Sequence, residues 1–209
     1  MNKLKVYVVG TSRGYARFIH DAILVEDMSL ADIILFTGGE DVDPNLYGER
    51  THQTTYCNPK RDEIELQEYL ESLNWPDTLR VGVCRGNQLL TILNGGKLVQ
   101  DVSDHAMGRM HNVLTIDQEI FQTTSMHHQM AYPYNLPEKD YEILAYAYPK
   151  RSKYYEGSGI HWKDEYEEPE VIYFPETNSL GIQGHPEMMD LNSPFVIYLN
   201  QLIISKLNK

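Results

Sequence analysis

The segment LRVGVCRGNQLLTILNGG, residues 79–96, constrains the fold more than any other part of the sequence. Its first five residues form a short, mainly apolar run that predicts a buried strand. The residues after Cys84 predict a helix that the Gly-Gly pair at 95–96 ends. The strand must therefore pass into the helix through a sharp turn at Cys84, and Gly82 and Gly86 leave room for the backbone to double back.

Short apolar runs alternate with helical patterns through the first half of the chain, which predicts a parallel sheet. Helical patterns cover 12–21, 61–74 and 193–207. The first of these patterns is weak, and the last has Pro194 in its first turn. The predicted strands are 4–10, 22–26, 31–39, 79–83 and 180–185, with 112–117, 141–148 and 170–176 in a later region that has few helices.

These elements define the expected fold class as α/β. We expect a doubly wound, mostly parallel sheet flanked by helices, with an added antiparallel strand region in the C-terminal half. No linker, repeat or low-complexity tract interrupts the sequence, so we expect a single domain over residues 1–209.

The charge and the cysteine count exclude several classes of protein. With 18 basic and 30 acidic residues, the formal charge of −12 lacks the basic footprint of nucleic-acid binding. No apolar run approaches the ~18 residues of a membrane span, and the N-terminal MNKLKVYVVG does not have the pattern of a secretory leader. Two cysteines far apart do not make a disulfide framework. We therefore expect a cytoplasmic protein with no nucleic-acid partner and no membrane association.

Cys84 permits two interpretations. Free cysteine is among the most buried residue types, so a lone cysteine after a strand is often a core residue. Alternatively, the Gly-x-Cys-x-Gly turn presents the thiol as a nucleophile at a helix N-terminus, whose dipole favours the thiolate. The backbone N–H of Arg85 would then be placed to bind an oxyanion. The two glycines at fixed offsets favour the nucleophile.

A cysteine nucleophile needs a base and a group that orients the base. The segment GIQGHPEMMD, residues 181–190, offers both, because His185 follows a predicted strand and Glu187 lies two residues further on. A carboxylate at this spacing can accept from the Nδ1–H of the imidazole and leave Nε2 facing the thiol. Taken alone, the segment could be an ordinary turn; together with the elbow, it predicts a Cys-His-Glu triad.

Six segments of the sequence resemble a known family. The elbow GVCRGNQ and the turn GHPE are similar to those of class I glutamine amidotransferases, and most similar to the branch of γ-glutamyl-γ-aminobutyrate hydrolases, which are γ-glutamyl hydrolases (peptidases). Each segment is ordinary alone, but six in the right order are specific. The other four are GGEDVDPNLYGE at 38–49, RDEIE at 61–65, GGKLVQD at 95–101 and SMHHQ at 125–129.

The resemblance implies a flavodoxin-like fold and a catalytic role for each matched residue. Cys84 is the implied nucleophile, His185 the base and then the acid, and Glu187 the group that orients His185. The backbone N–H groups of Gly39 and Arg85 form the implied oxyanion hole. The implied reaction is hydrolysis of a γ-glutamyl amide through a glutamyl thioester, which releases an amine or ammonia and then glutamate.

The resemblance also implies where the glutamyl head of a small-molecule substrate binds. Gln88 lies one helical turn beyond Cys84, on the same helix face as the thiol. The implied binding residues are Gly38, Gln88, Ser125, His127 and His128.

The sequence predicts neither a metal nor a cofactor. The pair His127–His128 does not have the spacing of ordinary zinc motifs, and the acids and histidines that precede it do not complete such a motif. TGGEDVDP contains three acids, but the twelfth position counted from Asp41 is His52, so the EF-hand pattern fails. The further residues with ligand chemistry in this region are Asp101, Asp104, His105 and His111.

Two segments depart from the family pattern. The stretch from Gly10 to Ala31 is shorter than is usual in the family, which predicts a first βαβ unit reduced to a single short helix. Residues 148–170, rich in tyrosine and containing Trp162, replace what is usually a tight turn. Their rings could stack on a leaving group or dock on a partner, or the segment could be an extended hairpin.

The same triad serves more than one function. A free-standing hydrolase of γ-glutamyl amides fits the matched segments best. A glutaminase subunit of a two-component amidotransferase would instead pass ammonia to a separate synthetase, and would be nearly inactive until that partner aligned the loop at Gly38. A third alternative is a catalytically idle binding protein on the same fold, although such a protein has no need of a complete triad.

Overall fold

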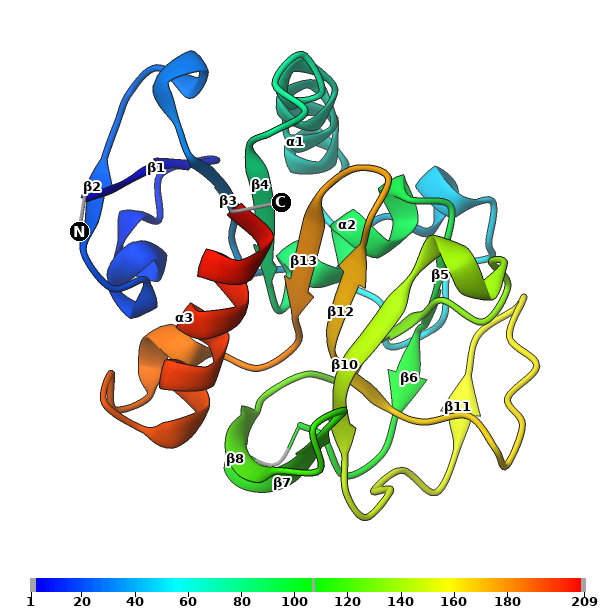
Figure 1. Ribbon diagram of the computed structural model, residues 1–209. Coiled ribbons are helices and arrows are strands. Elements are labelled where there is room, and N and C mark those ends of the chain that lie inside the picture. Colours follow the sequence, from blue (N-terminus) through cyan, green and yellow to red (C-terminus); the bar gives the residue numbers. More distant parts are fainter. Residues whose placement is uncertain (1–2, 107, 208–209) are drawn as a thin grey trace.

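A computed structural model describes residues 3–106 and 108–207 of the chain (Figure 1). Within these residues a nine-stranded sheet has the order β2-β1-β3-β4-β13-β12-β10-β7-β8. The first five strands of this order are parallel, and each of the other four is antiparallel to the strand before it. Their bounds are β1 Leu4–Val8, β2 Ala22–Leu24, β3 Ile33–Phe36, β4 Leu79–Val83, β7 Arg109–Thr115, β8 Ile120–Ser125, β10 Glu142–Ala147, β12 Pro169–Phe174 and β13 Ser179–Ile182.

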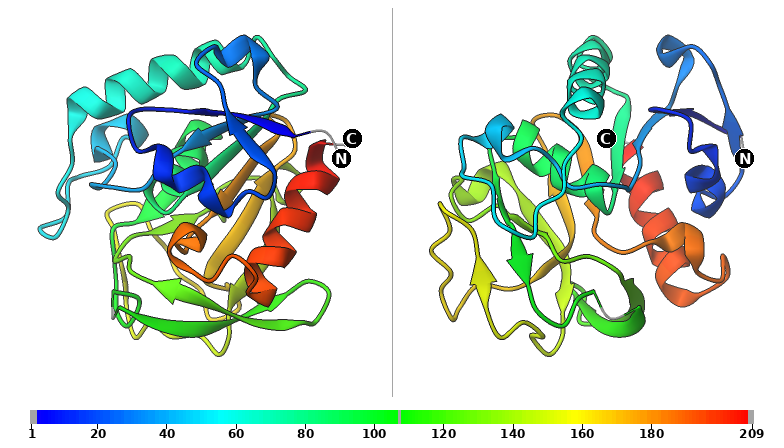
Figure 2. Two further views of the ribbon diagram at one scale, coloured as in Figure 1. Left: turned by 90° about the vertical axis from the view of Figure 1, so that its left-hand side faces the viewer. Right: turned by 180° about the vertical axis from the view of Figure 1, so that it is seen from behind.

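Both faces of the sheet are covered by helices. Side chains of a strand point alternately to its two faces, so Ile33 joins the core beneath α3 whereas Ile34 joins the core beneath α1 and α2. Figure 2 shows α3 on the opposite side of the sheet from α1 and α2. The predicted α/β class is therefore confirmed, with the antiparallel strands in the C-terminal half. The α-helices are α1 Pro59–Ser72, α2 Arg85–Leu93 and α3 Pro194–Leu207.

The first βαβ units are reduced, as the short segment before Ala31 predicts. Short 3-10 helices, η1 and η2, take the place of α-helices between β1, β2 and β3 in the described part of the chain. The weak helical pattern at 12–21 becomes η1, and its N-cap Ser12 makes no side-chain capping hydrogen bond. The 3-10 helices are η1 Arg13–Phe18, η2 Met28–Leu30, η3 Pro44–Tyr47, η4 Glu138–Asp140 and η5 Pro186–Met188.

Residues 148–170 do not extend the hairpin of β10 and β12. Their strand β11 (Tyr155–Glu156) pairs with β6 (Asp101–Val102), which lies far away in the sequence. Trp162 stacks on Tyr155 with ring centroids 3.7 Å apart, and Tyr166 stacks on Tyr134 at 3.9 Å. The hairpin interpretation is therefore wrong, and these rings pack against a small buried cluster of Val99, Val102, Met130 and Tyr132.

Several short strands were not predicted. β8 was missed, as were β5 (Lys97–Val99) and β9 (Met130–Tyr132), which pair with each other beside the main sheet. Among the described residues, no helix combines the length and the apolar character that crossing a membrane requires.

Candidate active site

The carboxyl ends of three neighbouring parallel strands bring the predicted catalytic segments together. In the register of the sheet, Phe36 of β3 pairs with Gly82 of β4, and Val83 of β4 pairs with Ile182 of β13. The Gly38-Gly39 loop, Cys84 and His185 follow these strands within three residues of each strand end. This edge is where ligands bind in open α/β sheets.

Cys84 occupies the predicted elbow between β4 and α2. Its backbone has φ 54° and ψ −108°, a strained conformation for a residue with a side chain. A Cβ atom at Gly82 would overlap the backbone of Gly86, and one at Gly86 would overlap the carbonyl group of Phe36. Glycine is thus required on both sides of the turn, and the strand enters the helix with the thiol at the helix N-terminus.

Hydrogen bonds link Cys84 to His185 and His185 to Glu187. The Nδ1 atom of His185 is 2.7 Å from Oε1 of Glu187, and the imidazole also hydrogen-bonds with the thiol group. All three side chains are buried. The backbone N–H of His185 donates to Oγ1 of Thr124 at 2.6 Å, which fixes the start of the turn.

The contacts of His185 favour its charged form. Burial lowers the pKa of an imidazole, but the hydrogen bonds and negative charges of Cys84 and Glu187 outweigh burial and raise the pKa of His185 to about 10. An imidazolium in this position stabilises a neighbouring thiolate, which is the nucleophilic form of cysteine. The geometry therefore suits an ion pair of Cys84 and His185 oriented by Glu187.

The Gly38-Gly39 loop is held close to the imidazole. A Cβ atom at Gly38 would lie 2.6 Å from Oη of Tyr15 and 3.1 Å from Cε1 of His185. Gly39 has φ +145°, and a Cβ atom there would overlap the guanidinium of Arg61. The same guanidinium donates from Nη2 to the carbonyl oxygen of Gly38 at 2.9 Å. A larger side chain in the loop assigned to the oxyanion hole would therefore displace the Tyr15 hydroxyl or the Arg61 guanidinium, and at Gly39 it would also strain the backbone.

The side chain of Arg85 points to α1, where it meets two buried carboxylates. It forms ion pairs with Asp62 and Glu65, and all three side chains are at most 3% exposed. Glu65 also accepts from Nε of Arg61 at 2.7 Å, so the network links α1 to both the elbow and the glycine loop. Burial raises the pKa of Asp62 despite the neighbouring charge of Arg85. Sequence reasoning missed these partners, although the RDEIE segment contains them.

A cavity of about 250 Å³ opens beside the thiol. Gln88 is buried at its wall and donates from Nε2 to the carbonyl oxygen of Gln129 at 3.0 Å. His128 lies 3.1 Å from Asp41, and hydrogen bonding to Asp41 raises the pKa of His128 although burial acts in the opposite direction. The lining residues are Gly39, Glu40, Asp41, Tyr56, Cys84, Gln88, Met126, His127, His128 and Gln129.

Most of the predicted binding residues meet at this cavity. Gln88, His127 and His128 line it, and Gly38 precedes the lining residue Gly39. Ser125 differs, because its buried hydroxyl donates to the carbonyl oxygen of His105 at 2.7 Å. Sequence reasoning missed the acidic wall made by residues 40 and 41, although both lie inside the matched GGEDVDPNLYGE segment.

Two groups of residues have the composition of metal ligands. One is exposed or half-buried and consists of His52, Asp101 and Glu156, with His52 and Glu156 2.9 Å apart. The other is buried and consists of His105, His127 and Glu170.

Two solved structures show which fold this arrangement resembles. The structure of a GMP synthase subunit from Thermoplasma acidophilum is similar over 100% of this chain and 96% of its own, with a TM-score of 0.60 and 16% identity. PurLQS from Thermotoga maritima is similar over 99% of this chain and 100% of its own, with a TM-score of 0.59 and 14% identity. At such identities the likeness shows the fold alone, which is that of the class I glutamine amidotransferases.

Residues 19–134, more than half of the chain, match the Peptidase C26 family, and the chain belongs to that family. The glutamine amidotransferase-like protein YvdE homolog of Lactococcus lactis subsp. cremoris is 46% identical over 77 residues, which cover 36% of this chain and 40% of the relative. YvdE of Lactococcus lactis subsp. lactis is 39% identical over 94 residues, covering 44% of this chain and 39% of its own. The matched segments thus span about two fifths of these relatives. Family membership confirms the expected resemblance to glutamine amidotransferase-like proteins.

Proposed function

We propose that the protein hydrolyses a γ-glutamyl amide, with Cys84 as nucleophile, His185 as base and acid, and Glu187 as the orienting group. The observation that carries this proposal is the chain of contacts from the thiol through the imidazole to the carboxylate, at the edge of a small polar cavity. A buried cysteine kept only for packing needs neither a strained elbow nor a charged partner.

The cavity has charges that suit the head of a glutamyl group. The acidic wall formed by Glu40 and Asp41 would attract its α-ammonium, and Gln88 and the cationic form of His128 would hold its α-carboxylate. This arrangement would place the γ-carbonyl carbon at the thiol, because all four residues and Cys84 line the same cavity.

The first half-reaction replaces the amide by a thioester. The thiolate of Cys84 attacks the γ-carbonyl carbon, and the negative charge that develops on oxygen is bound by the N–H groups of Gly39 and Arg85. The imidazolium of His185 then gives its proton to the leaving nitrogen as the C–N bond breaks. Glu187 keeps the imidazole oriented throughout this transfer.

The second half-reaction restores the enzyme. Neutral His185 removes a proton from water, and the resulting hydroxide attacks the thioester carbon. Collapse of the second tetrahedral intermediate releases glutamate and regenerates the Cys84 thiolate beside the imidazolium. The sum is amide plus water giving glutamate plus an amine or ammonia.

A second candidate is a glutaminase subunit that delivers ammonia to a synthetase. It is favoured by the likeness of the whole chain to PurLQS and to the GMP synthase subunit. A protein of this kind uses the same triad, so the two candidates differ in whether the chain works alone.

Glutamate release by the purified chain tests both candidates, with L-glutamine and a panel of γ-glutamyl amines as substrates. We expect turnover of at least one γ-glutamyl amine that Cys84→Ala abolishes and the matched variant Cys57→Ala retains. Slow turnover of every substrate, with Cys84 still alkylated by a glutamine-like electrophile, would favour the second candidate. Failure of Cys84 to react with such an electrophile would refute both candidates and leave a binding protein.

A further inference from the structure

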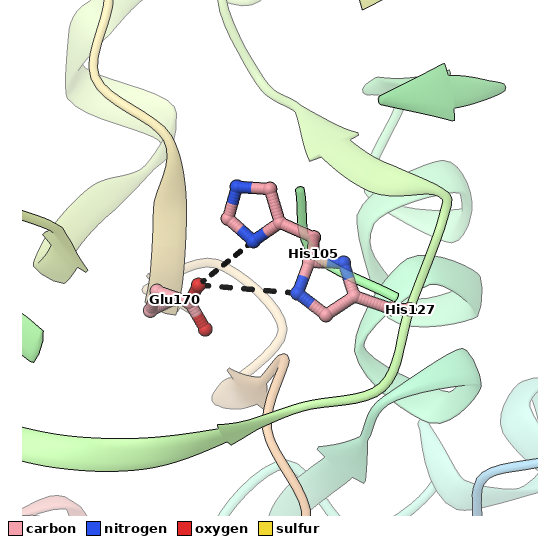
Figure 3. A group of neighbouring side chains, drawn as sticks. All are labelled: His105, His127 and Glu170. Carbon is pink, nitrogen blue, oxygen red and sulfur yellow. Dashed lines mark ion pairs between the residues drawn. The ribbon is translucent and has the colours of Figure 1, made fainter. Parts of the chain in front are cut away.

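A cluster of histidine and glutamate side chains is buried behind the cavity wall. His105 follows β6, His127 lies between β8 and β9, and Glu170 lies on β12; their exposed fractions are 0%, 4% and 1%. One ligand atom from each residue lies within 4.8 Å of the others. Figure 3 shows both imidazole rings directed at the Glu170 carboxylate.

The outer contacts of the two rings determine where their hydrogens lie. Nε2 of His105 is 3.2 Å from a carboxylate oxygen of Glu168, and Nδ1 of His127 is 2.9 Å from the carbonyl oxygen of Gln129. Both partners are acceptors only, so these nitrogens carry the hydrogens. In the neutral rings the lone pairs therefore lie on Nδ1 of His105 and Nε2 of His127, which face each other and Glu170.

Both facing nitrogens and one of the two Glu170 carboxylate oxygens lack hydrogen bonds among the described residues. Nδ1 of His105, Nε2 of His127 and Oε2 of Glu170 are buried without a hydrogen-bond partner in residues 3–106 and 108–207. Two lone pairs and a carboxylate directed at one another repel unless a cation lies between them. The three buried side chains thus have the arrangement of ligands around a metal ion.

The distances favour a metal ion over a shared proton. Oε1 of Glu170 is 3.7 Å from Nδ1 of His105 and 3.9 Å from Nε2 of His127, which is too long for a hydrogen bond. In a tetrahedral site with bonds of about 2.0–2.1 Å, two ligand atoms lie roughly 3.4 Å apart. The observed separations are within about half an ångström of that value.

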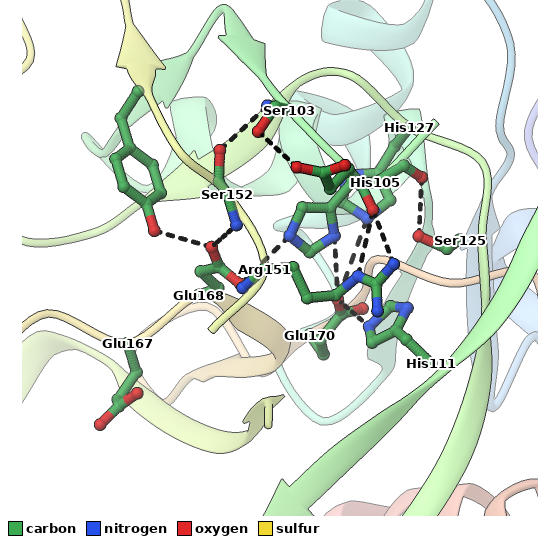
Figure 4. Close-up of polar contacts among 12 residues, drawn as sticks. Ser103, His105, His111, Ser125, His127, Arg151, Ser152, Glu167, Glu168 and Glu170 are labelled. Carbon is green, nitrogen blue, oxygen red and sulfur yellow. Dashed lines mark hydrogen bonds and ion pairs between the residues drawn. The ribbon is translucent and has the colours of Figure 1, made fainter. Parts of the chain in front are cut away.

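The surroundings match those of a protein metal site. Ligating histidines usually donate their second N–H to a carboxylate or a backbone carbonyl, as His105 does to Glu168 and His127 does to Gln129. His111 donates from Nε2 to Oε1 of Glu170 at 2.7 Å, which orients the third ligand. Figure 4 shows the contacts of His105 with Glu168 and of His111 with Glu170, together with Arg151, whose guanidinium donates to the carbonyl oxygen of Asp104.

We propose that His105, His127 and Glu170 bind a divalent cation of the zinc class. Two imidazoles and one carboxylate are a zinc donor set, although the spacing of these residues in the sequence does not match a zinc motif. The ion would join three segments that are distant in sequence and would fix residue 127 at the wall of the catalytic cavity. Because the site is buried, binding should accompany folding.

The test is the zinc content of the protein after refolding from urea in excess zinc and exhaustive dialysis. We expect about one zinc per chain in the wild type and below about 0.1 in Glu170→Gln and in His105→Asn. The matched control is His52→Asn, which alters the exposed group of potential ligands and should leave the zinc content unchanged. The wild type should also show a higher urea midpoint after refolding with zinc than after refolding with a chelator.

Two results would overturn the proposal. One is a wild-type chain with a native circular dichroism spectrum and no zinc after refolding in excess metal. The other is full zinc content in both folded ligand variants. If those variants do not fold, the cobalt-substituted wild type decides: the visible bands of tetrahedral cobalt support the site, and their absence contradicts it.

Discussion

Replacement of Arg85 by methionine would break the buried charge network that joins the elbow to α1. The variant keeps the backbone N–H of residue 85 and much of the side-chain volume, but it leaves Asp62 buried without its cation. Glu65 retains Arg61 at 2.7 Å, so one carboxylate rather than two loses its partner. Removal of one member of a buried ion pair costs about 3–5 kcal/mol, and the remaining contact of Glu65 places the expected loss near the lower end, about 3 kcal/mol.

Urea denaturation measures this loss in the free energy of unfolding by linear extrapolation. The matched control is Arg13→Met, because the Arg13–Glu26 pair has side chains 57% and 76% exposed and should contribute less than about 1 kcal/mol. Arg85→Met/Asp62→Asn should recover part of the loss, since it removes the unpaired charge. An Arg85→Met loss no larger than that of Arg13→Met would refute the assignment of the network as a stabilising link.

The same variant has a defined dependence on pH. Burial already raises the pKa of Asp62, and loss of Arg85 should raise it further. A carboxyl group whose pKa is higher in the folded state destabilises the fold above that pKa and ceases to do so below its unfolded value. The deficit of Arg85→Met should therefore shrink as the pH falls toward the ordinary carboxyl range, and a deficit that grows in acid would contradict this account.

Three further substitutions test other parts of the structure. Gly86→Ala places a Cβ atom against the backbone of β3. Helix propensity favours alanine over glycine by ~1 kcal/mol, but we expect the clash to outweigh this gain and to lower the free energy of unfolding by more than that amount. Unchanged or increased stability in urea would contradict the close approach. Glu187→Gln removes a charge that raises the pKa of His185, so the alkaline limb of kcat/KM for glutamate release should move from near pH 10 to lower pH, and an unmoved limb would count against the pair. Trp162→Ala removes a half-buried ring stacked on Tyr155 and should cost about 1–3 kcal/mol of stability; a loss below about 0.5 kcal/mol would show that the stacked ring does not stabilise the fold.

The parallel half of the sheet could be predicted because each strand there lies within a short, mainly apolar run. β4 was predicted with its observed bounds, since it is buried on both faces and ends at the elbow. β8 was missed because the edge strand Ile120–Ser125 mixes exposed and buried polar residues. The packing of residues 148–170 could not be predicted, because the stacking partner Tyr134 belongs to a distant segment.

The residues that meet at Cys84 could be predicted from local patterns, since the elbow and the His185-x-Glu187 turn each consist of consecutive residues. The supporting contacts could not, because they join different elements. Only the backbone N–H of Arg85 was predicted to have a role, whereas its side chain forms ion pairs with α1. His105 lies near a carboxylate on β12, and no sequence motif connects these two residues. Contacts between distant residues were thus predicted only where a local motif marks each partner.

Nucleophilic catalysis by Cys84 requires a covalent glutamyl thioester on its thiol. The most direct measurement is the mass of the protein quenched in acid during turnover of a γ-glutamyl amide, followed by peptide mapping. We expect one added glutamyl group on the peptide that contains Cys84, none on the peptide that contains Cys57, and none in Cys84→Ala. Hydrolysis that continues in Cys84→Ala, without any adduct in the wild type, would contradict this role of Cys84.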